Sequence, residues 1–315
     1  MLESASPRRQ GGSDQLLGMV PYLLGYHPTE ALVAIIKKPD RPLPRVVSLP
    51  LSEPTTMLLN HLTLQIPEKA SGIVLIGYGP ATHRAKIAAV SEVLQLLAPV
   101  VGRFLYTDGI LTCLTPACTC SAAEGVAVDP RSTRLAAELA MTGRVALPSR
   151  QDLHTLIAAD PIAQAATEAA LGSLDATGTP GPADLASLIA PAGAGERLTA
   201  DQVARLCLAL HDQDNLVTAW HHTRGRRRHH ELWLDVTRRA PEQHAGAPAA
   251  LAAWSAWCRG QDALAQAALD RARAVTPDDG FTRIVGYLVD AHLPAHRLRW
   301  PLTPHLDAPS SGSHS

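Results

Sequence analysis

The chain has 315 residues, of which 46% are hydrophobic and 18% charged, and its 28 Lys and Arg residues nearly balance 29 Asp and Glu residues. This composition excludes a disordered chain and a protein whose whole surface is an electrostatic footprint for nucleic acid or anionic lipid. No apolar run reaches about 18 residues, and the first residues lack the apolar core of a signal peptide. We therefore expect a neutral, cytoplasmic, globular protein of about two domains.

The first half of the chain alternates helical and strand patterns. After an expected disordered tail over residues 1–12, apolar residues at helical spacing predict a helix from Ser13, which Pro21 should kink or split. Short β-branched runs then predict strands over residues 31–36 and 45–51. Ser52 is the expected cap of the helix that follows.

The apolar run over residues 72–79 is typical of a strand that is buried on both faces. Thr82 is the expected cap of the next helix. Residues 103–115 read as a hairpin that turns at Asp108 and Gly109. Together these patterns predict an α/β domain over residues 13–150, with a mixed sheet flanked by helices.

The second half of the chain is predicted to be helical. Residues 151–240 form a helical region with a Gly/Pro/Ala-rich linker near 172–195. Residues 241–300 contain a helical hairpin with tetratricopeptide-like spacing, and 301–315 form a second disordered tail. The spacing is that of Gly260, Ala265, Leu269, Ala272 and Pro277.

Two residues are candidate acids or bases. His27 lies in a loop between a helix and a strand, where binding residues often occur, and Asp108 precedes a glycine in the hairpin turn. A histidine bonded to local backbone and an ordinary turn aspartate explain both positions more simply.

The best candidate for a phosphate site is the turn after the third strand. Gly77 and Gly79 resemble the start of a dinucleotide-binding turn, but Thr82 stands where the third glycine belongs. A structural turn is the simpler interpretation. Tyr26 and Arg150 are further candidate ligand-binding residues, although a solvent-facing ion pair also explains Arg150.

Cys113, Cys118 and Cys120 are the only concentrated set of potential metal ligands. A structural zinc site needs four ligands, and no fourth ligand is near in sequence. Buried free thiols are the favoured interpretation, with zinc or a disulfide left open.

A locally basic segment invites a nucleic-acid interpretation through Arg224, Arg226, Arg227 and Arg228. It has no interleaved aromatic residues for base stacking. We therefore expect an exposed loop, with contact to a phosphate backbone as the alternative.

Six segments resemble an uncharacterised, mainly actinobacterial family, domain of unknown function 4192 (DUF4192). They are residues 16–35, 113–125, 145–153, 210–220, 232–241 and 254–277. The resemblance implies no activity, so it transfers no site residue. The chain departs from the family where Gln213-Asp214 replaces a typical Arg-Asp pair and where Thr119 separates two cysteines that are often adjacent.

The absence of P-loop, HExxH, GxSxG and CxxC motifs favours a non-catalytic partner-binding or regulatory protein. Its C-terminal helices would form the surface for a partner or a second copy. The alternative is a small-molecule or nucleotide-binding enzyme with Tyr26, His27 or Asp108 at the strand ends of the α/β domain. Convergence of His27, Asp108 and Cys113 in one cleft would favour that enzyme.

Overall fold

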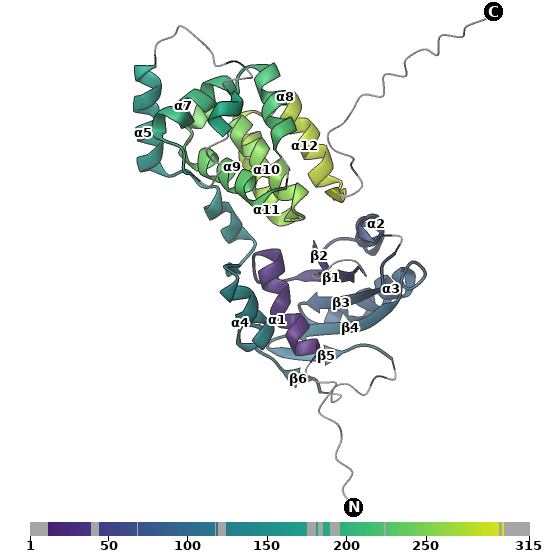
Figure 1. Cartoon of the computed structure of the whole chain (residues 1–315). Helices are drawn as coiled ribbons and strands as arrows, with labels where there is room; N and C mark the ends of the chain where they lie inside the picture. Colours follow the sequence, from purple (N-terminus) through teal and green to yellow (C-terminus); the bar gives the residue numbers. More distant parts are fainter. Residues whose placement is uncertain are drawn as a thin grey trace, which may run out of the picture.

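The first part of the protein is built around one mixed sheet (Figure 1). The computed structural model describes residues 12–38, 44–67, 69–116, 118, 124–174, 181, 185–189, 196–223, 225–295 and 298. The strands are β1 (Ala31–Lys37), β2 (Arg45–Pro50), β3 (Gly72–Tyr78), β4 (Val100–Thr107), β5 (Ile110–Cys113) and β6 (Val126–Ala127). Their order in the sheet is β2-β1-β3-β4-β5-β6.

Pairing in this sheet is antiparallel at every step except one. β3 and β4 are parallel, and the intervening helix α3 (Arg84–Leu94) makes the crossover. Parallel neighbours require such a crossover, whereas β4 and β5 need only a tight turn. The predicted mixed sheet and the predicted hairpin at Asp108 are therefore confirmed.

Helices cover both faces of the sheet. α2 (Thr55–Gln65) and α3 lie on one face, over Leu32 and Leu75, and α1 (Ser13–Leu24) and α4 (Arg134–Met141) lie on the other, over Val33 and Ile76. Because successive strand residues point to opposite faces, a strand that is covered on both sides must be apolar throughout. The unbroken burial of β1 from its first to its sixth residue fits this requirement.

The predicted start of α1 at Ser13 is confirmed, but three expected helix caps are wrong. The N-cap of α1 is Gly12 and not Ser13. Ser52 lies in a turn, and α2 begins only at Thr55, with Pro54 as its N-cap. A short 3₁₀ turn, η2 (Ala81–His83), contains Thr82, so α3 begins only at Arg84. Pro21 does not split α1, since the helix is buried around it.

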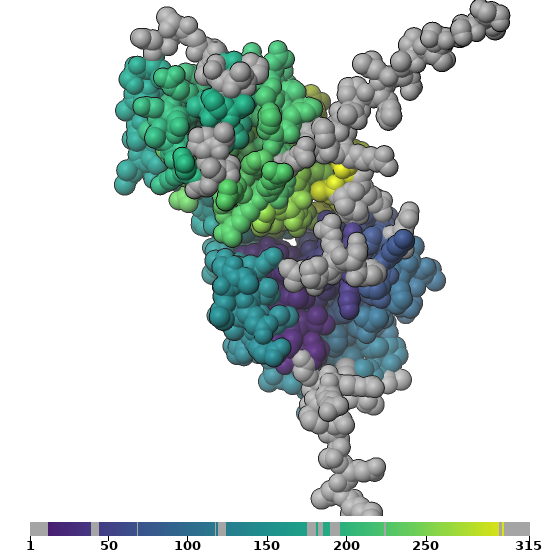
Figure 2. Space-filling view, viewed as in Figure 1, coloured from purple at the N-terminus to yellow at the C-terminus, as the bar shows by residue number. Residues whose placement is uncertain are grey.

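The second part is a set of packed helices. They are η4 (Gln151–Leu156), α5 (Pro161–Ser173), α7 (Ala200–Ala209), α8 (Gln213–His222), α9 (Arg227–Arg239), α10 (Gly246–Cys258), α11 (Asp262–Val275) and α12 (Gly280–Asp290). Two further 3₁₀ turns are η3 (Pro130–Ser132) and η5 (Glu242–His244). Figure 2 shows the two parts as lobes in contact, the sheet lobe in purple and blue and the helical lobe in green and yellow. No helix among the described residues has the length and apolar character needed to cross a bilayer.

α10 lies at the centre of the helical part, with α9, α11 and α12 packed around it. It is rich in alanine and buried on all sides, which is typical of a helix that is apolar all round. α10 and α11 form the predicted hairpin, and Gly260 takes the positive φ of 71° that the turn between them requires. The likeness of this hairpin to a tetratricopeptide unit stays a prediction.

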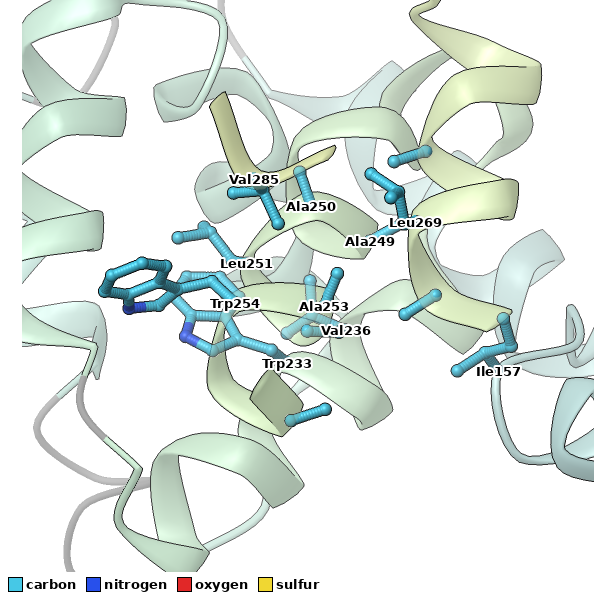
Figure 3. Packing of buried hydrophobic residues seen from close by; sticks show 14 of the residues in the cluster. Ile157, Trp233, Val236, Ala249, Ala250, Leu251, Ala253, Trp254, Leu269 and Val285 are labelled. Atoms are coloured by element: carbon cyan, nitrogen blue, oxygen red, sulfur yellow. The ribbon is translucent and has the colours of Figure 1, made fainter. Parts of the chain in front are cut away.

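Thr223 joins three helices through hydrogen bonds inside this core. The Nε1–H of Trp233 donates to the Thr223 hydroxyl at 2.7 Å, and the Nε1–H of Trp254 donates to the Thr223 carbonyl at 3.0 Å. The hydroxyl in turn donates to the Ala219 carbonyl at 2.8 Å. Figure 3 shows Trp233 and Trp254 among the buried residues Leu251, Val236 and Ala253. The bulky rings therefore bury their polar atoms without leaving them unpaired.

Thr223→Val should lower the free energy of unfolding by about 1–3 kcal/mol, because it leaves the buried Trp233 N–H without an acceptor. Thr223→Ser keeps the hydroxyl and should lower the free energy of unfolding by clearly less than Thr223→Val does. Urea unfolding followed by tryptophan fluorescence measures both variants. Equal losses for Val and Ser would show that the methyl group, and not the hydroxyl, stabilises the core.

Candidate functional site

Tyr26 and Arg150, two of the predicted ligand-binding residues, meet at the junction between the two parts. The segment around Tyr26 pairs with Leu147 through a β-bridge, with N–H···O distances of 2.9 Å from Leu147 to Gly25 and from His27 to Leu147. Backbone pairing thus holds Arg150, three residues after Leu147, close to the Tyr26 segment. The Tyr26 ring is buried, and its hydroxyl is hydrogen-bonded to Ser48.

A half-buried carboxylate completes this side of the junction. Asp262, in the first turn of α11, lies 3.8 Å from Arg45 of β2. Burial raises the pKa of Asp262, while Arg45 and Arg150 act in the opposite direction. The cavity among these residues is only about 20 Å³, enough for one water molecule. This part of the junction is a closed polar contact between the two lobes.

A second polar contact joins α2 to the end of α12. The rings of His61 and His292 lie 4.5 Å apart, and His61 Nδ1 is 3.5 Å from a Glu53 carboxylate oxygen. The Gln65 amide donates to the His292 carbonyl. Burial, followed by the neighbouring His61, lowers the pKa of His292. At these two points polar groups join the lobes, and the buried Tyr26 ring adds an apolar contact with the helical core.

The turn after β3 is explained by packing. A Cβ on Gly77 would lie 2.3 Å from Ile87 of α3, so glycine is needed there for close helix–strand contact. The Glu30 carboxylate lies beside Gly79, and His83 lies 3.4 Å from Glu30. Thr82 does not cap a long helix, which removes one element of the predicted phosphate site.

His27, Asp108 and Cys113 do not share one cleft. Asp108 is in the β4–β5 turn with φ of 49°, whereas Cys113 is the last residue of β5, about 10 Å beyond the first residue of that strand. His27 faces Asp129 and Arg131, and burial is the main cause that lowers its pKa. This separation counts against an enzyme that uses the three residues together.

The cysteines do not form a complete metal site within the part of the chain that the structure describes. Cys113 lines a hollow beside β5 and Cys118 is exposed, whereas Cys120 lies outside the described residues. Among the described residues there is no group of three or more potential metal ligands. Zinc binding by the three cysteines stays untested.

The basic segment is not the exposed loop that its sequence suggests. Arg227 and Arg228 begin α9, with Arg226 as its N-cap, and Arg224 lies outside the described residues. Arg227 pairs with Glu231 at 2.7 Å. His230 is buried, and its Nδ1 is 2.9 Å from the Ser255 hydroxyl. Part of the segment is therefore a structural element of the helical core.

The outer face of α12 carries apolar side chains that the protein itself leaves exposed. Its inner face, with Phe281, Val285 and Val289, is buried against the helical core, and the Asp279 carboxylate caps its N-terminus at 2.7 Å. On the outer face, Ile284 is 48% and Tyr287 71% exposed. Because α12 lies at the edge of the helical lobe (Figure 1), this face is open to a partner.

Ile284 and Tyr287 form the centre of a shallow groove of about 480 Å³. Gly280 and Arg283 of the same helix complete it, together with the buried Leu288. Residues 280, 284, 287 and 291 follow each other at spacings of four, three and four, which places them in one stripe along the helix. The sequence predicts helical structure in this part of the chain but does not single out these residues.

A family model described as "Domain of unknown function (DUF4192)" matches residues 14–296. No curated protein and no solved structure matches the chain.

Acid should destabilise the helical core through His230. Burial lowers the pKa of His230 from 6.5 to about 4, so the unfolded chain binds the proton more readily between these values. Stability is complete above pH 6.5 and falls as the pH drops towards 4, by about 3 kcal/mol from this group.

The test compares urea unfolding at pH 7 and pH 4 for wild type and His230→Gln, whose amide can still bond to Ser255. Between pH 7 and pH 4, the free energy of unfolding of His230→Gln should fall by about 3 kcal/mol less than that of wild type. His222→Gln, at an exposed position of α8, should behave as wild type. The same loss in wild type and His230→Gln would contradict the assignment.

Proposed function

The chain belongs to the DUF4192 family, and we propose that it is a non-catalytic, cytoplasmic interaction protein that pairs with a second copy of itself through the outer face of α12. The observation that carries the proposal is the exposure of Ile284 and Tyr287 in one stripe on the edge helix. Exposed apolar patches with a polar rim are typical of interaction sites. The actinobacterial origin suggested by the family resemblance stays a prediction.

A second copy fits the face because of how its charges are placed. Arg283 lies in the first half of α12 and Asp290 at its end. Antiparallel pairing brings Arg283 of each copy towards Tyr287 and Asp290 of the other, which supplies a cation–π contact and an ion pair. Parallel pairing would place equal charges together. Asp290 also holds Arg273 of its own chain at 2.5 Å, which fixes its position.

The side-chain sizes on this face are also compatible with antiparallel pairing. Gly280, at one end of the stripe, leaves room for the backbone of the second copy. The bulky Ile284 and Tyr287 lie in the middle of the stripe, where antiparallel copies place them against each other. An isologous contact of this kind closes on itself as a dimer.

The dimer should be weak. α12 has 11 residues, so the contact is only about 16 Å long, and small interfaces are typical of transient association. The fraction of dimer should therefore rise with protein concentration, and such a reversible equilibrium suits a regulatory protein.

Analytical ultracentrifugation over a wide concentration range should show a reversible monomer–dimer equilibrium. Tyr287→Glu and Ile284→Glu should each shift it to monomer, because a buried unpaired carboxylate opposes association. Arg283→Glu should weaken the dimer to a smaller extent.

The matched control is Ile162→Glu, since Ile162 is 86% exposed on α5 at the opposite edge of the helical lobe (Figure 1). It should leave the equilibrium unchanged, and circular dichroism should show that all variants are folded. A strict monomer at every concentration, or a dimer that Tyr287→Glu leaves intact, would refute the proposal.

A further inference from the structure

A ligand-sized hollow lies on the sheet lobe, far from α12 along the chain. It has a volume of about 370 Å³, within the range of about 300–1,000 Å³ that is typical of small-molecule sites. Its walls come from the first turn of α1, the start of α4, and the outer strands β5 and β6. It opens on the face of the sheet that α1 and α4 cover.

Hydrogen bonds between separate elements fix the walls of this hollow. The Gln15 side-chain oxygen of α1 accepts from the Leu135 N–H of α4 at 2.8 Å. The Tyr106 hydroxyl donates to the Val128 carbonyl at 3.0 Å, and the Val128 N–H donates to the Gly109 carbonyl at 2.8 Å. A site that is already formed spends little free energy on ordering when a ligand binds.

Part of the lining is apolar. Phe104 of β4, Leu111 of β5 and Val128 contribute to it, and Cys113 of β5 lies in the same lining. Phe104 lies on the covered face of the sheet with the residues packed under α1, yet it is only partly buried. The hollow therefore offers an aromatic ring and an aliphatic surface to an apolar ligand body.

The lining also includes two carboxylates, Asp14 and Asp129. One oxygen of Asp14 accepts the Gln15 N–H at 2.9 Å, and one oxygen of Asp129 accepts the Arg131 N–H at 3.0 Å. Each carboxylate has further acceptor capacity, because its two oxygens offer about four lone-pair sites. Arg134, the cation of the lining, pairs with Glu138 at 3.2 Å.

We propose that this hollow binds a small organic cation, a primary amine with an apolar body. The ammonium group lies between Asp14 and Asp129 and donates to both, and the apolar body lies against Phe104 and Leu111. The volume and the apolar wall make the hollow a ligand site, and the carboxylates select the charge. Neither wall involves α12, so this site goes beyond the proposed pairing function.

Three probes of nearly equal shape and different charge test the proposal: 2-phenylethylamine, 2-phenylethanol and phenylacetate. Isothermal titration calorimetry on the full chain at pH 7 should show binding of the amine with a Kd of about 1 mM or tighter, as expected for a ligand of this size. The alcohol should bind at least tenfold more weakly, and phenylacetate should not bind.

Asp14→Asn and Asp129→Asn should each weaken amine binding at least tenfold. Asparagine can still cap η3 at position 129, so the wall is preserved. Asp108→Asn is the matched control, because it removes one carboxylate from the same lobe at a turn that tolerates asparagine. It should leave amine binding unchanged.

Equal binding of the three probes would overturn the selection of a cation. Absence of amine binding, or amine binding that both Asn variants retain, would overturn the site itself. Tyr287→Glu should bind the amine as wild type does, so a failed dimer and a failed ligand site are distinguished by the same set of proteins.

Discussion

The helical half depends on one constraint, which is that α10 has no polar face. Its buried residues occupy every side of the helix, from Gly246 to Trp257. Such a helix is stable only when other helices enclose it. Alanine side chains let α9, α11 and α12 approach closely, while Trp254 and Trp257 fill the wider gaps. The enclosing helices are consequently amphipathic, and α12, at the edge of the lobe, presents its second face outwards.

The junction between the lobes combines polar contacts with apolar burial. Two apolar clusters flank the sheet, and a third fills the helical part and takes in Tyr26 of the first part. Around it, Arg45, Asp262, His61 and His292 provide polar contacts between the parts. Contacts of this polar kind resemble transient interfaces more than they resemble a core. The lobes are therefore held together by these polar contacts and by the burial of Tyr26 in the helical cluster, and the β-bridge to Leu147 fixes the position of the Tyr26 segment.

The sequence predicts elements that are governed by local periodicity. The apolar run of β3, the hairpin at Asp108 and the α10–α11 turn at Gly260 follow from side-chain alternation and from turn chemistry. The sequence does not predict the junction between the two parts. Arg150 lies near Tyr26 only because the β-bridge between Tyr26 and Leu147 pairs two segments that are far apart in the chain. The sequence does not predict the start of α9, because arginines occupy its N-cap and its first two positions, and the buried face of the helix begins only at His230.

Packing and hydrogen bonding explain some of the candidate residues and leave others unexplained. Gly77, Asp108 and His230 attract attention by residue type, but a close helix contact, a hairpin turn and a buried hydrogen bond account for them. Ile284 and Tyr287 are ordinary residue types whose exposure has no such explanation, and their signal is that they fall outside the inward stripe of α12. A residue points to function when folding leaves it unexplained, and this can be judged only after the neighbours of that residue are known.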